Sequence, residues 1–294
     1  MRRIAGAMLA LVVLLTAGIS GIAVGQDMHA GGPPKVLTVF REYTKPGKSG
    51  MAHEKTESAF VQAMAQAKWP THYLAVESLS GKSRVLFLTG YDSFAAWEKD
   101  TLATMKNKAL SAALDRAWAA DGDLLSETDG GAFVFREEYS LRPRVDIPHM
   151  RYFEISHVQV RHGHDKDWDE LVKMVNAAYE KIPDAHWAAY AGVYGLSDNT
   201  YLFFNPMKSA EEIDKGFAEG KDFEKMMGEE GMKKLNELSA AAIESSQTNL
   251  FAFNPRMSYP PDEWVKADPE FWTPKAAAAP AAGKKAAEKP ADKH

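Results

Sequence analysis

An internal repeat is the feature that most constrains the fold of this chain. When the sequence is displaced by 116 residues, its two halves align over several separated segments. The run RVLFLTGYDS, which begins at Arg84, then lies on TYLFFNPMKS, which begins at Thr200, and Gly47 lies on Gly163. A single displacement that serves segments far apart in the sequence indicates two copies of one supersecondary unit.

Each copy shows the same order of elements, which is strand–helix–strand–strand–helix–strand. Short runs that are rich in β-branched and aromatic residues, and that are bounded by Gly, Pro and Ser, predict the strands. In the second copy, Gly220, Gly228 and Gly231 predict that the last helical segment is broken into pieces. We expect strands at residues 36–43, 72–79, 84–90 and 132–140, and again at 151–161, 186–195, 200–205 and 248–254.

A βαββαβ unit is a ferredoxin-like fold, in which both helices cover one face of a four-stranded antiparallel sheet. The other face of such a sheet must also be covered. Two units in one chain can cover each other, so the predicted fold class is α+β, with two tandem ferredoxin-like units packed as an intramolecular α+β barrel. We expect the units at residues 36–140 and 151–254, joined by a proline-marked linker at 141–150.

The first 25 residues have the three parts of a secretory signal peptide. Arg2 and Arg3 precede an apolar run, which ends in small residues before Gln26. We predict cleavage before Gln26 and a periplasmic or secreted protein with no stable membrane span after cleavage. The alternative is an uncleaved membrane anchor, because the apolar run approaches the length of a span.

The C-terminal part continues beyond the second unit in two segments of different composition. Residues 255–274 form an extension rich in Pro and aromatic residues, and residues 275–294 form a tail of Ala, Pro and Lys. The tail lacks large apolar residues, so we expect it to be disordered.

Composition excludes several classes of protein. The chain has no cysteine, which excludes disulfides, thiolate catalysis and metal centres held by cysteine. Its formal net charge is −5 and it has no basic stripe, which argues against nucleic-acid binding.

The two copies share a local pattern that resembles a known superfamily. Lys45-Pro46-Gly47 and Arg161-His162-Gly163 end the first strands, an amphipathic helix follows, and a hairpin leads into YDSFAAWEK from Tyr91. This pattern, over residues 36–254, resembles the dimeric α+β barrel superfamily, which includes NIPSNAP proteins, antibiotic-biosynthesis and haem-degrading monooxygenases, and chlorite dismutases. The resemblance implies two sheets that close a barrel, with pockets between each sheet and its helices. It implies no single reaction, and it leaves a homodimer open.

The strongest candidate for a ligand site is the second strand of the second copy, HWAAYAGVY. Strand alternation places His186, Tyr190 and Tyr194 on one face, with the small residues Ala188 and Gly192 between them. This pattern is typical of a ligand pocket, and equally of a barrel interface in which the aromatic rings fill gaps.

Three further polar residues are candidates for the same pocket. His72 opens the second strand of its copy, as His186 does, which indicates a duplicated site or two surface histidines. His157 and Arg41 occupy the same place on the two first strands. They form either a polar anchor inside the barrel or a structural ion-pair network, which we expect to include Arg136 and Glu138.

No motif identifies a metal or a cofactor. The run HGHDKDWD from His162 has a spacing that matches no zinc or iron signature, so we predict no metal site. Haem is compatible with the superfamily but no motif supports it, and the cofactor stays unknown. The favoured function is an exported protein that binds a small, partly apolar molecule. The alternatives are a cofactor-free or haem-linked monooxygenase or isomerase, and a structural envelope protein without a ligand.

Overall fold

The computed structural model describes residues 32–274. The predicted signal peptide and the predicted disordered tail lie outside the described residues. Within the described part of the chain, no helix is both long enough and apolar enough to cross a bilayer.

Both copies contain the predicted order of elements. The first copy consists of β1 (Val36–Thr44), α2 (Met51–Ala67), β2 (Tyr73–Ser78), β3 (Arg84–Tyr91), α3 (Phe94–Lys106), α4 (Lys108–Asp121) and β4 (Leu125–Phe135). The second consists of β5 (Tyr152–Val160), α5 (Asp165–Tyr179), β6 (Ala188–Tyr194), β7 (Thr200–Met207), α6 (Glu211–Ala242) and β8 (Ile243–Phe253). Short 3₁₀ turns, η2 (Glu137–Tyr139) and η3 (Ile147–His149), lie between the copies, and α7 (Asp262–Ala267) and α8 (Pro269–Trp272) follow the second copy.

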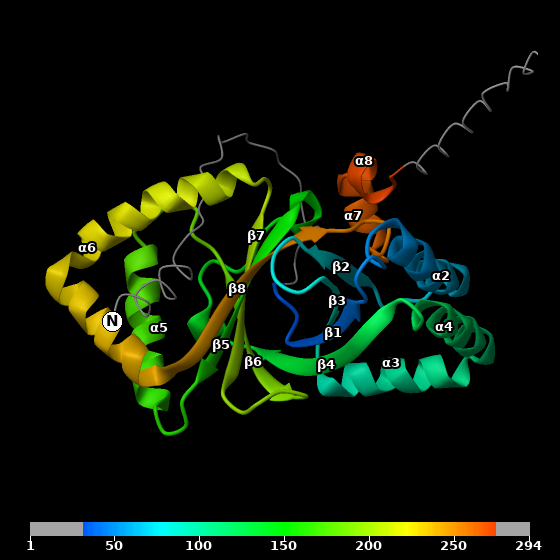
Figure 1. Ribbon diagram of the computed structural model, residues 1–294, viewed down its shortest axis with the longest axis horizontal. Coiled ribbons are helices and arrows are strands. Elements are labelled where there is room, and N and C mark those ends of the chain that lie inside the picture. Colours follow the sequence, from blue (N-terminus) through cyan, green and yellow to red (C-terminus); the bar gives the residue numbers. More distant parts are fainter. Residues whose placement is uncertain (1–31, 275–294) are drawn as a thin grey trace, which may run out of the picture.

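The strands form a closed antiparallel barrel in the order β1-β3-β2-β8-β5-β7-β6-β4. Each copy supplies a four-stranded sheet in the order 4-1-3-2, and the two sheets join where β2 pairs with β8 and where β4 pairs with β6. The barrel lies in the centre, with α2, α3 and α4 on one side and α5 and α6 on the other (Figure 1). The predicted fold class is confirmed.

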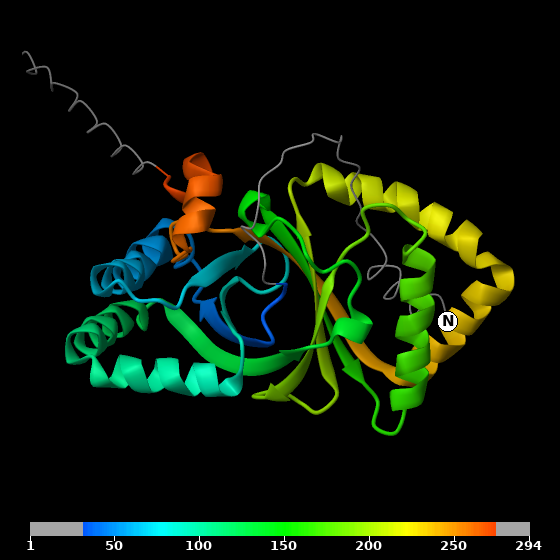
Figure 2. The ribbon, with the colours of Figure 1, turned by 180° about the vertical axis from the view of Figure 1, so that it is seen from behind.

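Residues from both copies fill the interior of the barrel. Leu37 and Val39 of β1 and Phe153 and Ile155 of β5 point inward, as strand alternation requires, and belong to one buried cluster. A separate cluster packs between the second sheet and its helices, where Trp168, Tyr179 and Phe223 are among the buried side chains. The view from behind shows the helices of the two copies on opposite flanks of the barrel (Figure 2).

Two elements differ from the sequence prediction. Strand β4 begins at Leu125 rather than at residue 132, because the polar run Leu125–Gly131 pairs with β1. The strand ends at Phe135 because the chain then turns into η2. Helix α6 continues past Gly220 and Gly231 and is interrupted only at Gly228, where φ is 64° and ψ is 177°.

Gly195 lies where β6 meets β4, at one of the two junctions between the copies. Its φ is +78°, and a Cβ added there would lie 2.1 Å from the backbone oxygen of Gly130. The chain therefore needs glycine here both for its conformation and for the close approach of two backbones.

We predict that Gly195→Ala lowers the free energy of unfolding by more than about 2 kcal/mol, because the clash adds to a left-handed strain of about 1–2 kcal/mol. Gly163→Ala is the matched control, since Gly163 has φ +82° but open space around the added Cβ. The free energy of unfolding of the Gly163→Ala control should fall only by the left-handed strain of about 1–2 kcal/mol. Urea unfolding of both variants measures the difference, and equal losses would show that the close approach at Gly130 has no energetic consequence.

Glu154 of β5 points away from the barrel interior, toward the helices of the second copy. Burial raises the pKa of its carboxyl group from 4.5 to about 8. Because the folded pKa lies above the unfolded value, the folded state is favoured at low pH and loses stability as the pH rises through about 8.

Glu154→Gln should remove this loss, because the amide stays neutral. The melting temperature of the natural protein should fall more steeply than that of the variant as the pH rises from about 4.5 to about 8. Glu244→Gln, at an exposed position of β8, is the control and should keep the natural slope. Parallel pH profiles for all three proteins would mean that Glu154 ionises freely in the folded state.

Candidate ligand-binding pocket

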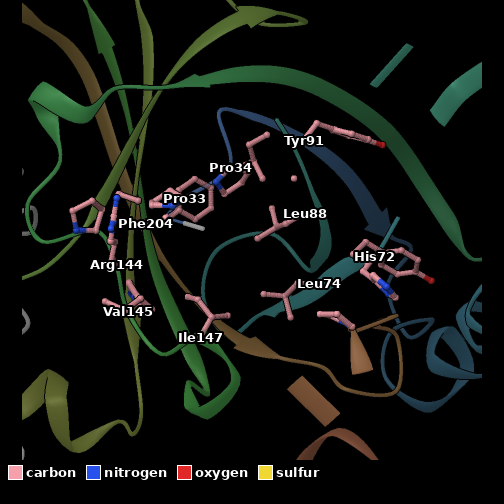
Figure 3. Close-up of a pocket in the computed structure, with 18 of the residues that line it drawn as sticks. Pro33, Pro34, His72, Leu74, Leu88, Tyr91, Arg144, Val145, Ile147 and Phe204 are labelled. Carbon is pink, nitrogen blue, oxygen red and sulfur yellow. The ribbon is translucent and has the colours of Figure 1, made fainter. Parts of the chain in front are cut away.

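A cavity of about 1040 Å³ lies at one end of the barrel (Figure 3). Its lining comes from the first residues of β1, β2, β5 and β6 and from the last residues of β3 and β7, which antiparallel pairing brings to the same end. The apolar wall is formed by Leu37, Leu74, Leu88, Phe153, Ala188 and Phe204.

Both copies contribute equivalent positions to this pocket. Leu37 of β1 corresponds to Phe153 of β5, and Leu88 of β3 corresponds to Phe204 of β7, because β1–β3 and β5–β7 pair in the same register. The pocket therefore lies inside the barrel, where the two copies meet. The superfamily resemblance had instead implied pockets between each sheet and its helices.

Three segments outside the repeats form the rim of the pocket. They are Gly32–Pro34 before β1, Pro143–Ile147 from the linker, and Pro261 to Trp264 after β8. From the sequence, the last two were expected only as a linker and an extension. The prolines in these segments could have indicated this role, because proline fixes the backbone and a rigid segment can form a fixed edge of a pocket.

His186 lines the pocket as predicted, but its ring is held by the backbone. Its Nδ1 lies 2.7 Å from the backbone oxygen of Asp184, and its Nε2 lies 2.9 Å from that of Pro206. Both partners are acceptors, so the N–H of the ring donates to one of these two carbonyl oxygens, and the ring lies between the start of β6 and the end of β7.

His72 and Tyr190 also line the pocket and are differently placed. The His72 ring stacks on Tyr259 at 4.7 Å between centroids, and its Nδ1 is buried without a hydrogen-bond partner among the described residues. The Tyr190 hydroxyl donates to the backbone oxygen of Pro34 at 3.2 Å, and burial raises the pKa of Tyr190. The structure thus brings three of the six predicted site residues into one cavity.

Tyr194 lies outside the pocket. Its side chain is 63% exposed and packs edge-to-face on Phe94, with ring centroids 6.0 Å apart. The β4–β6 pairing is irregular between Ala132 and Phe133, at the level of Gly192 and Tyr194. Strict alternation along β6, on which the shared face depended, does not hold beyond this point.

Arg41 and His157 lie inside the barrel but farther from the pocket. They follow Leu37 and Phe153 by four residues along their strands, which is roughly 13 Å. Arg41 forms an ion pair with Asp129. Burial and the nearby Arg41 lower the pKa of His157.

The expected network with Arg136 and Glu138 does not form around Arg41. These two residues pair with each other instead. The hypothesis about their partners was therefore wrong, because η2 turns this segment away from the barrel strand that was predicted to continue to residue 140.

Charged side chains stand at the rim. Arg144 is the single Arg or Lys among the described residues that line the pocket, and Asp92, Asp146 and Glu263 line it as well. Arg144 lies on the same wall as Pro33 and Phe204, and Tyr91 and His72 lie across the cavity from it (Figure 3). The site is thus apolar at its base and polar around its opening.

Comparisons with known proteins place the fold. A candidate monooxygenase from Fusobacterium nucleatum is similar in structure with a TM-score of 0.50 at 11% identity, over 75% of this chain and 93% of that chain. An anthrone oxidase-like protein is similar with a TM-score of 0.46 at 14% identity, over 75% of this chain and 92% of that chain. A candidate chlorite dismutase is similar with a TM-score of 0.45 at 13% identity, over 79% of this chain and 99% of that chain. No protein-family profile matches the sequence, and no curated protein matches it significantly.

The closed barrel and the similarity to the Fusobacterium nucleatum protein define the class of fold. The chain has the dimeric α+β barrel fold, with both ferredoxin-like halves in one polypeptide. At this level of identity the similarity shows the fold and leaves the activity to be argued from the site.

His186→Phe should destabilise the protein by about 1–3 kcal/mol, because a backbone oxygen loses its imidazole donor and leaving a buried acceptor without a partner costs about that much. His72→Phe is the matched control, since the new ring can still stack on Tyr259, and it should change stability by less than about 1 kcal/mol. Thermal unfolding compares the two. A His186→Phe protein as stable as the natural one would contradict the role assigned to this histidine.

Proposed function

We propose that the protein binds a small, partly apolar molecule in the barrel pocket. The observation that carries this proposal is the cavity of about 1040 Å³ at one end of the barrel, lined by apolar side chains from both copies. Its size is that of a small-molecule site, for which volumes of about 300–1,000 Å³ are usual.

The distribution of polar groups supports an orientation for the molecule. Its apolar part would lie against Leu74, Leu88 and Phe204, and its polar end would face the rim, where Arg144 and His72 stand on opposite walls. An apolar body with a few convergent polar contacts is the usual composition of such sites. We retain export as part of the proposal, because the predicted signal peptide supports binding outside the cytoplasm.

Catalysis on the bound molecule is the second candidate function. The feature that favours it is the unpartnered Nδ1 of His72 in the pocket wall, since a histidine nitrogen without a partner can accept a proton. A monooxygenase or isomerase of the same superfamily would use such a group. In that case the His72→Phe variant should still bind the molecule but should no longer convert it. The purified variant should then carry the molecule in its unconverted form.

Ala188→Leu tests the binding proposal. Ala188 lines the cavity, so a larger side chain should fill part of it and exclude the molecule. If the cavity accommodates the side chain, stability should change by less than about 1 kcal/mol, whereas a tight core would lose about 1–3 kcal/mol through overpacking. Native mass spectrometry of the protein purified from its own host, together with thermal melts, measures both effects.

The matched control is Val193→Leu, on the same strand at a position that is 43% exposed. The natural protein and this control should carry a co-purified molecule, and Ala188→Leu should carry less of it. If the natural protein carries none, or if Ala188→Leu is strongly destabilised and shows no dependence on the molecule, the interior is a packed core and a structural envelope role becomes the better explanation.

A further inference from the structure

A second polar cluster lies away from the pocket, between the sheet of the first copy and its helices. It consists of Glu42 on β1, His53 and Glu57 on α2, and Asp121 at the end of α4. All four residues are buried, with exposed fractions of 2% or less. One nitrogen or oxygen atom from each lies within 4.8 Å of those of the other three.

The atoms of the cluster surround one point. From Nε2 of His53 the distances are 2.9 Å to Oε2 of Glu42, 3.6 Å to Oδ1 of Asp121 and 3.9 Å to Oε1 of Glu57. Around a tetrahedral ion with bonds of about 2.1 Å, ligand atoms are roughly 3.4 Å apart. The three observed distances lie on both sides of that value, so a small shift of the side chains would place all four atoms around an ion.

Two carboxylate oxygens of this cluster have no partner in the described part of the chain. They are Oε1 of Glu57 and Oδ2 of Asp121, which lack a hydrogen bond, and Oε1 of Glu57 lies 3.9 Å from Nε2 of His53. Burying a polar atom without a hydrogen bond costs about 1–3 kcal/mol, and more for a charged group. Such atoms in a sealed site indicate a ligand that the protein itself does not supply.

The second copy shows that this layer of the fold does not require polar groups. The strand registers place Val158 of β5 where β1 has Glu42. The buried face of α5 carries Trp168, Leu171 and Val172. In the first copy, by contrast, the apolar cluster of this layer is reduced to Ala75, Val85 and Met257, with Phe87 packed against it.

The cluster gathers three carboxyl groups around one imidazole at a site that is almost wholly buried. The buried Tyr73 hydroxyl on β2 faces the same carboxylates. A divalent cation would neutralise this negative group as protons do, and would also engage the unpartnered oxygens.

We propose that Glu42, His53, Glu57 and Asp121 form a closed structural site for one divalent first-row transition-metal ion. One imidazole nitrogen with three carboxylate oxygens suits Zn²⁺ or Mn²⁺ better than Mg²⁺ or Ca²⁺, which take oxygen ligands alone. Four protein ligands leave no open position, as in structural rather than catalytic sites. The ion would fasten α2 and α4 to β1, where the second copy uses an apolar core.

Metal content and calorimetry test the proposal on the full-length, untagged protein. The protein is expressed in medium supplemented with Zn²⁺ or Mn²⁺, since the sealed cluster favours loading during folding, and its metal is measured by inductively coupled plasma mass spectrometry. Chelator-treated protein is then titrated with ZnCl₂, MnCl₂ and MgCl₂. We expect one equivalent of Zn²⁺ or Mn²⁺ per chain, an increase in melting temperature with the ion, and at least tenfold weaker binding of Mg²⁺.

Two variants and a control separate a metal site from a proton-sharing network. Glu57→Gln removes one proposed ligand. Glu42→Val introduces the residue type that the second copy has at this position, so the Glu42→Val variant should fold whether or not an ion binds. Both should lose the bound ion and its effect on the melting temperature. Glu54→Gln, one turn away on the same helix, should retain both. Absence of metal from the natural protein under both loading and titration, or equal binding by Glu42→Val, would overturn the proposal.

Discussion

Closure of the barrel is the constraint on which the rest of the structure depends. Each four-stranded sheet has helices on one face only, and its other face would expose a continuous apolar surface. The pairings of β2 with β8 and of β4 with β6 remove all four sheet edges and enclose the apolar faces in one interior. The short β2–β8 contact, which spans Val76 to Ser78, is followed by the C-terminal extension, which pairs with β2 again through Tyr259.

The two copies have kept the strands of a common unit and diverged in the layer between sheet and helices. In the second copy this layer is a large apolar cluster around Trp168 and Tyr179. In the first copy the apolar cluster of this layer is small, and four buried ionisable side chains meet where apolar groups would pack. Buried charges destabilise a fold unless they are paired, protonated or bound to a metal. The asymmetry therefore indicates that the first copy retains these groups for a specific role.

The sequence predicted the parts of the structure that periodicity and repetition determine. The repeat predicted the order of elements and hence the barrel, and strand alternation brought His186 and Tyr190 to one cavity. Alternation failed at Tyr194, because an irregular pairing between strands distant in sequence cannot be read from either strand alone. The prediction of no metal site considered only the segment from His162. His53 and Glu57 lie four residues apart on one face of α2 and could have been recognised as polar residues on a buried helix face.

The pocket combines equivalent strand positions with a rim that is not repeated. Equivalent positions from the two copies form its base, but they carry different side chains, since Leu37 and Leu88 of the first copy correspond to Phe153 and Phe204 of the second. The rim adds to this difference, because Pro34, Arg144 and Trp264 come from segments that occur once in the chain. Specificity for one orientation, and so for a molecule with distinct ends, can then come from the diverged base and from these non-repeated segments together. A tandem protein can acquire this asymmetry, whereas a homodimer of identical units would have to repeat every rim segment on both sides.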